Sequence, residues 1–229
     1  MEAYLDNSAT TRVDAQVQEL MKKLMDVDFG NPSSRHQKGV VAEGYIKEAR
    51  QKIAATLKVD PKELIITSGG TESNNMALIG TALAAKRKGN HIITTAVEHP
   101  SVKATASFLE EQGFRITFLS VDSRGQISLE DLKEALTPDT ILVSIMYVNN
   151  EIGTIQPVEE AAKLVHATVP GAVFHVDAIQ AYGKVMIRPK QQGIDLLSVS
   201  SHKFHGPKGA GFLYCSSCLL YTSDAADEL

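Results

Sequence analysis

The stretch Ile141-Leu142-Val143-Ser144-Ile145-Met146 decides the fold class, because its apolar side chains do not alternate with polar ones. Successive side chains of a β-strand point to opposite faces of the sheet, so this stretch needs cover on both faces. Parallel strands with a helical layer on each side provide that cover. The stretch therefore predicts a buried strand of an α/β protein.

Shorter β-rich runs and helical segments alternate on both sides of this stretch. Strands are predicted at 64–67, 91–95, 115–121, 141–148, 173–176 and 196–199, and helices at 14–26, 36–57, 72–86, 101–112, 128–136 and 158–167. The alternation indicates right-handed βαβ crossovers. We therefore expect a mostly parallel sheet with helices on both faces.

Composition and charge exclude several classes of function. The chain has 229 residues, of which 43% are hydrophobic and 22% charged, and its net charge is -4. This composition is typical of globular proteins, and the charge gives no basis for binding nucleic acid or an anionic membrane. Residues 1–12 do not resemble a signal peptide, and no run approaches the ~20 apolar residues that span a bilayer. We expect a cytoplasmic protein that binds neither nucleic acid nor membranes directly.

A glycine-containing motif, Thr67-Ser68-Gly69-Gly70-Thr71-Glu72, follows a predicted strand and opens a helix. Paired glycines, free N–H groups at a helix N-terminus and the hydroxyl of Thr71 favour an anion. The spacing matches neither a P-loop nor a dinucleotide fingerprint, so a phosphate bound here is not predicted to be a nucleotide's. Read alone, the motif is equally typical of a plain helix cap.

Asp177 and Lys203 each stand at or just after the end of an apolar strand, where ligands of open α/β sheets bind. A carboxylate at Asp177 could hold a protonated ring nitrogen. Lys203, close to Ser200 and His202, could supply a neutral amine for a Schiff base if its pocket is partly apolar. Read alone, a cap or salt bridge at Asp177 and a solvated Lys203 are the more common situations. His202 and His205 could bind a metal, but no convincing third ligand accompanies them.

Two further motifs follow strands. In Glu98-His99-Pro100-Ser101 the imidazole of His99 could stack on a planar ring. In the stretch 149–154 the amide of Asn150 could bond to a ring hydroxyl or to a substrate carboxylate. Each motif alone is more often a turn than a binding site.

As an ordered set, these motifs resemble cysteine desulfurases of the NifS/IscS type. These are class V aminotransferases, which are fold-type I enzymes that use pyridoxal 5'-phosphate (PLP). The likeness covers residues 1 to about 214. It rests on the stretches 4–11, 30–34, 68–75, 98–99, 149–154, 177–180, 200–203 and 206–209.

The resemblance implies a role for each candidate site residue. Lys203 would bind PLP covalently and move the substrate's α-proton, and Asp177 would pair with the pyridinium nitrogen. His99 would stack on the ring and act in catalysis. The remaining roles are Gln180 at the ring oxygen, Gly70, Thr71, Ser200 and His202 around the cofactor phosphate, and Asn150 at the substrate and the ring hydroxyl. No metal is implied.

The resemblance also implies a reaction and a domain plan. The family converts L-cysteine to L-alanine and an enzyme-bound persulfide, whose sulfur passes to an acceptor or iron–sulfur scaffold protein. The full-length enzyme would be a homodimer. We expect an N-terminal segment (1–15), an incomplete PLP-binding large domain (16–214) and a tail outside the family (215–229) that resembles sequencing read-through. Most of the small domain and the sulfur-accepting cysteine would be missing, so little or no turnover is expected.

Alternatives remain open. Selenocysteine lyase and cysteine sulfinate desulfinase share this fold and these motifs, and fold likeness does not separate them. The chain could also be a non-catalytic PLP-binding fragment, or an unstable one with uncovered apolar surface. Cys215 and Cys218, the chain's two cysteines, form a Cys-x-x-Cys pair, which is only half of a zinc site. We therefore interpret the pair as part of an inert tail.

Overall fold

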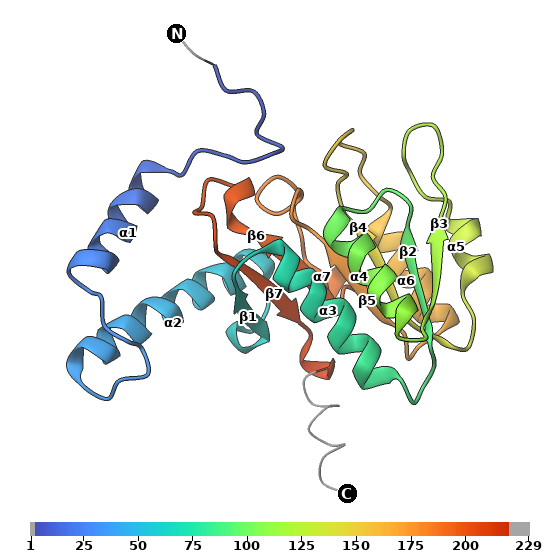
Figure 1. Ribbon diagram of the computed structural model, residues 1–229, viewed down its shortest axis with the longest axis horizontal. Helices are drawn as coiled ribbons and strands as arrows, with labels where there is room; N and C mark the ends of the chain where they lie inside the picture. Colours follow the sequence, from blue (N-terminus) through green and yellow to red (C-terminus); the bar gives the residue numbers. More distant parts are fainter. Residues whose placement is uncertain (1–2, 220–229) are drawn as a thin grey trace, which may run out of the picture.

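A computed structural model describes residues 3–219 of the chain (Figure 1). Its helices are α1 (Ala15–Asp26), α2 (Gln37–Leu57), α3 (Gly70–Ala85), α4 (Pro100–Glu111), α5 (Leu129–Ala135), α6 (Val158–Thr168) and α7 (Pro189–Gln192). Short 3-10 turns, η1 (Pro61–Glu63) and η2 (Ser201–Lys203), precede β1 and follow β6. The strands are β1 (Leu64–Thr67), β2 (His91–Thr95), β3 (Arg115–Leu119), β4 (Thr140–Met146), β5 (Val173–Asp177), β6 (Leu196–Ser200) and β7 (Gly211–Cys215).

Within residues 3–219 the strands form a seven-stranded sheet in the order β1-β7-β6-β5-β4-β2-β3. Strand β7 is antiparallel to both of its neighbours, and the pairs among β2 to β6 are parallel. Every residue of β4 is buried, as its uninterrupted apolar pattern predicts. The expected α/β class and the mostly parallel sheet are therefore confirmed.

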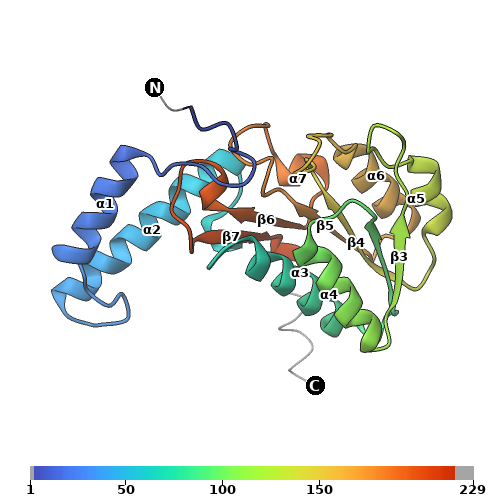
Figure 2. The ribbon, with the colours of Figure 1, turned by 45° about the horizontal axis from the view of Figure 1, so that its top comes forward.

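Helices cover both faces of this sheet (Figure 2). On one face Leu142 of β4 packs in a core with Leu78 of α3 and Val102 of α4. On the other face Val143 belongs to a second core that includes Val165 of α6. Neighbouring residues of β4 thus enter opposite cores, so both helical layers are fixed to the same strands. The C-terminal edge of those strands is left free for a site.

Strand β7 and helix α7 are absent from the sequence-based prediction. No helix separates β6 from β7, so the strand–helix alternation gives no signal for β7. Strand β7 pairs antiparallel with β1 and β6, so it is not part of a βαβ crossover. Its partner β1 also lies far away in the sequence. Strands β3 and β4 end earlier than predicted, since Val121 and Val148 form only isolated bridges.

Helices α1 and α2 extend to one side of the sheet (Figure 1). Helix α1 has no buried residue. Helix α2 reaches the body of the protein with its C-terminal turn, where Ala54 and Leu57 are buried. In the described part of the chain, no helix combines the length and the apolar character needed to cross a membrane.

Gly211 gives the first prediction, because it lies where β7 passes close to β6 and to the loop before α3. A Cβ at this position would come within 2.5 Å of the carbonyl oxygen of Val199 and 2.8 Å of the Cα of Gly69. Both are backbone atoms that cannot move aside cheaply. We expect Gly211→Ala to lower the free energy of unfolding by about 1–3 kcal/mol, measured by urea denaturation.

Gly80→Ala is the matched control. Gly80 lies on the exposed side of α3, and a Cβ there would meet nothing within 4 Å. The substitution should raise stability by about 0.5–1 kcal/mol, because alanine favours the helix. Equal effects of the two substitutions would contradict the close approach at Gly211.

Candidate functional site

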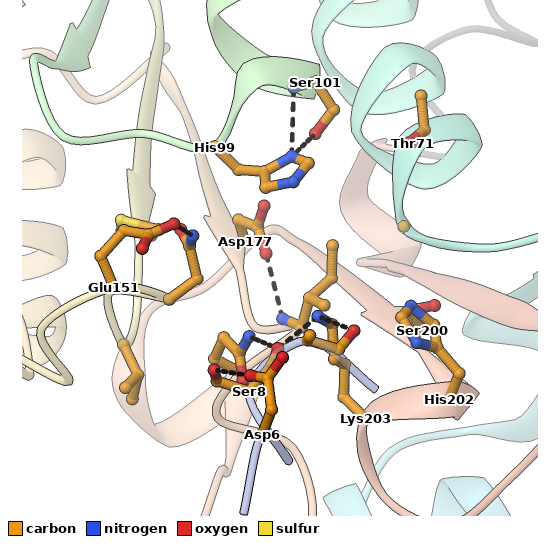
Figure 3. A pocket seen from close by; sticks show the side chains of 17 residues that line it. Asp6, Ser8, Thr71, His99, Ser101, Glu151, Asp177, Ser200, His202 and Lys203 are labelled. Atoms are coloured by element: carbon orange, nitrogen blue, oxygen red, sulfur yellow. Dashed lines mark hydrogen bonds between the residues drawn. The ribbon is translucent and has the colours of Figure 1, made fainter. Parts of the chain in front are cut away.

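A cavity of about 540 Å³ lies at the C-terminal edge of the parallel strands (Figure 3). It is bounded by the N-termini of α3 and α4, the ends of β4, β5 and β6, and residues of the N-terminal segment. All nine residues predicted for the site line it: Gly70, Thr71, His99, Asn150, Asp177, Gln180, Ser200, His202 and Lys203. Motifs that are far apart in the sequence are thus brought into one space.

Asp177, the last residue of β5, lies in the interior of this cavity with only 4% of its surface exposed. Its Oδ1 accepts a hydrogen bond of 3.0 Å from the backbone N–H of Ile179, and its Oδ2 accepts one of 2.8 Å from Nδ2 of Asn74. Burial raises the pKa of Asp177 above its ordinary value, whereas these two donors act in the opposite direction. A cationic ligand group would stabilise the ionised carboxylate further.

His99 is the N-cap residue of α4, and its ring faces the cavity close to Asp177 (Figure 3). The ring nitrogen Nδ1 accepts a hydrogen bond of 3.1 Å from the backbone N–H of Ser101 and lies 2.9 Å from the Ser101 hydroxyl. Capping the helix with Nδ1 fixes the ring plane. The neutral imidazole therefore carries its proton on Nε2.

Lys203 ends the η2 turn directly after β6. Its Nζ donates hydrogen bonds to the backbone carbonyls of Ser8 and Ala9, so the N-terminal segment lies across its ammonium group (Figure 3). Burial lowers the pKa of Lys203, and the charge of Lys184 lowers it further. A lowered pKa makes the neutral, nucleophilic amine easier to reach.

The part of the cavity between the start of α3 and the end of β6 suits an anion. Helix α3 begins at Gly70, where a Cβ would come within 2.1 Å of the side chain of Ile179, so a larger residue would require that side chain to move. The helix presents free N–H groups here, and the side chains of Thr71, Ser200 and His202 line the same end. Burial, followed by the charges of Lys203 and Lys208, lowers the pKa of His202. A bound anion would act on this pKa in the opposite direction.

Gln180 and Asn150 are engaged with other polar groups. Nε2 of Gln180 donates a hydrogen bond of 2.8 Å to the carbonyl of Ser8, and its Oε1 accepts one of 3.2 Å from Lys184. Nδ2 of Asn150 donates a hydrogen bond of 2.7 Å to Glu151. Both side chains line the cavity, and their roles toward a ring or a substrate stay predictions.

The sequence-based prediction missed part of the site. The N-terminal segment contributes Asp6, Ser8 and Ala9 to the cavity and is anchored by Thr11, whose backbone N–H and hydroxyl both donate to the carbonyl of His202. Asn74 was missed as well, although it follows Gly70 by four residues and so lies on the same face of α3. Helical spacing from the glycine motif is a signal that could have found it.

Neither histidine after β6 is part of a metal cluster. Within residues 3–219 no group of three or more His, Cys, Asp or Glu side chains is arranged to bind a metal ion. His202 Nδ1 lies 3.2 Å from the hydroxyl of Thr10, and His205 Nδ1 lies 3.0 Å from the carbonyl of Arg12.

Burial raises the pKa of Cys215, the last residue of β7, to about 11, which disfavours the thiolate. The predicted tail continues through residues 220–229, which lie outside the described residues.

Glu98 is a second buried carboxyl group close to the site. Its Oε1 accepts hydrogen bonds of 2.8 Å from the hydroxyl of Thr95 and from the backbone N–H of Met146. Burial, followed by the charge of Asp177, raises the pKa of Glu98 from 4.5 to about 8. At neutral pH Glu98 is therefore mostly protonated.

This pKa predicts how folding stability depends on pH. Between pH 4.5 and about 8 the folded chain keeps the Glu98 proton and the unfolded chain releases it. Stability therefore falls as the pH rises through that window. Glu98→Gln should reduce the loss between about pH 5 and pH 8 by on the order of 3 kcal/mol, measured by urea unfolding. Parallel stability curves for the two proteins would contradict the raised pKa.

The family profile described as Aminotransferase class-V matches residues 3–224. The chain belongs to the class V aminotransferase family. A curated member, cysteine desulfurase IscS of Dictyoglomus turgidum (strain DSM 6724 / Z-1310), is 51% identical over 213 residues. That match covers 93% of this chain and 54% of the relative. The chain thus spans about half the length of the curated class V relative.

Solved structures of class V relatives show the same fold. A NifS-like protein superposes with a TM-score of 0.93 at 43% identity, over 95% of this chain and 60% of the other. A structure titled "SspA in complex with cysteine" has a TM-score of 0.88 at 41% identity, over 93% of this chain and 61% of the other. The predicted large-domain fold of fold-type I PLP enzymes is therefore confirmed. The division at residues 15 and 214 stays a prediction.

Proposed function

We propose that this chain carries the PLP site of a cysteine desulfurase, which converts L-cysteine to L-alanine and transfers the sulfur to a thiol. One observation carries the proposal: a buried carboxylate, a lysine of lowered pKa and a helix N-terminus face the same cavity. This combination suits a planar cation that bears an aldehyde and a phosphate. The identity to cysteine desulfurases supports the choice of reaction.

The residues present fit PLP. Asp177 is a buried acceptor whose raised pKa calls for a cationic partner such as a pyridinium nitrogen. The start of α3 at Gly70, together with Thr71, Ser200 and His202, offers donors for the phosphate. Lys203 offers the amine that reacts with an aldehyde. Gln180 and Asn150 also line the cavity and offer amide groups to a bound ring or substrate.

When bound, PLP supplies an electron sink that stabilises negative charge at the α-carbon of the substrate. The protein's own residues set up that chemistry. The Asp177 carboxylate would favour positive charge on the ring nitrogen, and the His99 ring, which lines the same cavity, would pack against the bound group. Lys203, as a neutral amine, accepts the α-proton and returns it.

The overall reaction balances without an outside oxidant. L-cysteine and a thiol give L-alanine and a persulfide, so one C–S bond breaks, one S–S bond forms and the thiol proton ends on carbon. The acceptor thiol must be partly ionised to attack the substrate sulfur. Cys215 does not meet that requirement, because burial raises its pKa to about 11. The acceptor is therefore assigned to another thiol.

The proposal extends to partners and compartment. L-cysteine is the substrate, and a sulfur-acceptor or iron–sulfur scaffold protein takes the sulfur in the cytoplasm. The full-length enzyme acts as a homodimer. The name of the IscS relative supports the sulfur-transfer role. Cavity-lining residues drawn from strands, helices and the N-terminal segment support an enzyme site rather than an interaction module.

The test compares L-cysteine with D-cysteine on the PLP-loaded chain, in the presence of an added thiol. Both enantiomers react equally with free PLP, so D-cysteine controls for simple removal of the cofactor. We expect L-cysteine to displace PLP from Lys203 at a concentration at least about tenfold lower than D-cysteine does, measured as loss of the borohydride-trapped adduct. Alanine formed from L-cysteine is the second readout. Equal displacement by the two enantiomers would contradict a site built for L-cysteine.

A further inference from the structure

Asn74 lies behind the cavity wall and joins three elements of the site. It is on α3, and its side chain is fully buried. Its Nδ2 donates one hydrogen bond of 2.8 Å to Oδ2 of Asp177 at the end of β5 and another of 3.0 Å to the hydroxyl oxygen of Ser101 on α4. Ser101 in turn contacts Nδ1 of His99 at 2.9 Å. A continuous chain of hydrogen bonds thus runs from Asp177 to His99.

With Asp177 ionised, each bond in this chain has a definite direction. An ionised carboxylate only accepts, so the amide of Asn74 must turn its nitrogen toward Asp177. The same nitrogen donates to Ser101, which leaves the serine hydrogen free to point at His99. Since the backbone N–H of Ser101 also donates to Nδ1 of His99, that nitrogen receives two donors. The orientation of Asp177 and the tautomer of His99 are therefore linked through two side chains.

Asn74 is not placed for stability alone. Its carbonyl oxygen Oδ1 is buried and has no hydrogen-bond partner among residues 3–219. An unpaired buried acceptor costs folding free energy, so stability alone does not explain this orientation of the amide. The amide oxygen is therefore left unpaired among residues 3–219, while the amide nitrogen donates to both Asp177 and Ser101.

We propose that Asn74, acting through Ser101, is a positioning residue that holds the Asp177 carboxylate and the His99 ring in one fixed arrangement toward the cofactor. The role of this arrangement toward the cofactor rests on the proposed function. The hydrogen bonds that connect Asp177 to His99 are present in the chain without cofactor. The bond from Asn74 also favours the ionised form of Asp177, which a positively charged ring nitrogen requires. Asn74 does not line the cavity, so it touches neither substrate nor cofactor in this assignment.

Ser73 provides a matched control on the same helix. It is also fully buried, but its hydroxyl bonds to the hydroxyl of Thr67 at 2.8 Å and to the carbonyl of Gly69 at 3.0 Å. Ser73→Ala therefore removes a buried polar group from α3 without breaking the chain from Asp177 to His99. A purely structural role for Asn74 would make Asn74→Ala and Ser73→Ala behave alike.

The first experiment reads His99 directly by long-range 1H–15N spectra of the 15N-histidine chain without PLP. The chain has seven histidines, and the variant His99→Gln assigns the signal. We expect protonated Nε2 and unprotonated Nδ1 in the wild type. Asn74→Ala should shift the Nδ1 resonance although residue 74 does not touch the ring, and Ser73→Ala should leave it in place. An unshifted His99 signal in Asn74→Ala would overturn the proposal.

The second experiment is a double-mutant cycle on the PLP dissociation constant. Asn74→Ala should weaken PLP binding about tenfold in the wild type but less than about twofold in an Asp177→Asn background, because its effect passes through that carboxylate. Additive effects would overturn the proposal. Failure of the wild-type chain to bind PLP would refute the proposed function instead, and the His99 spectra would still decide the link. If Asn74→Ala does not fold, Asn74→Ser tests the same step, since a serine hydroxyl is too short to reach both partners.

Discussion

Lys203→Ala is expected to abolish retention of PLP by the chain, lowering the cofactor that stays bound through gel filtration by at least about 100-fold. Lys203 is the last residue of η2, and its side chain lines the cavity. Burial and the charge of Lys184 lower the pKa of its amine. Removing it takes away the group that reacts with the aldehyde, whereas the contacts to the phosphate remain. Weak, reversible binding should therefore persist and be displaced by inorganic phosphate.

Lys184→Ala is the control for this prediction. Lys184 is also partly buried, with a pKa lowered by burial, and it bonds to Gln180 at the edge of the site. Its removal leaves the Lys203 amine in place and withdraws only one of the causes that lower the pKa of Lys203, so PLP retention should fall far less than in Lys203→Ala. If Lys203→Ala retained as much PLP as Lys184→Ala, the cofactor would be held by another lysine and the site would be assigned wrongly.

Asp177→Asn is the second large effect, and it should act on binding and on stability in opposite directions. Truncating one partner of a buried charge pair costs about 3–5 kcal/mol, so we expect PLP affinity to fall by roughly 100-fold or more. Without PLP the same carboxylate is a buried charge whose pKa burial has raised. The variant without cofactor should therefore be at least as stable as the wild type in urea unfolding.

Asp195→Asn separates this effect from the general effect of removing a partly buried carboxylate. Asp195 precedes β6, and its Oδ2 accepts a hydrogen bond of 2.8 Å from the backbone N–H of Phe174. It lies at the opposite end of that strand from Ser200 and does not line the cavity. Asp195→Asn should leave PLP affinity unchanged, because this carboxylate does not line the cavity. A loss of stability in Asp177→Asn without a loss of PLP affinity would contradict the role of Asp177.

The central part of the fold could be predicted because its signal is local. The apolar run of β4 requires cover on both faces wherever it is placed, and each crossover helix lies next to its strand in the sequence. Strand β7 could not be predicted in that way. Its position depends on antiparallel pairing with β1, about 150 residues earlier in the chain, and only the folded sheet brings the two strands together.

The candidate site also contains some residues that the sequence predicts and others that it does not. Asp177 and Lys203 stand at or just after the ends of strands, and such positions converge in every parallel sheet. Asn74 and the N-terminal segment do not follow that rule. The amide of Asn74 matters because α3 packs beside β5, and the carbonyl of Ser8 matters because the segment is anchored at Thr11. Such contacts depend on tertiary packing rather than on sequence spacing.

The most direct test of the central claim is to mix the purified chain with PLP, reduce it with borohydride and map the modified peptide by mass spectrometry. The account predicts one pyridoxyl adduct, on Lys203, because within residues 3–219 only this lysine combines a lowered pKa with a place in the cavity beside Asp177. Labelling scattered over exposed lysines, or no labelling, would contradict it.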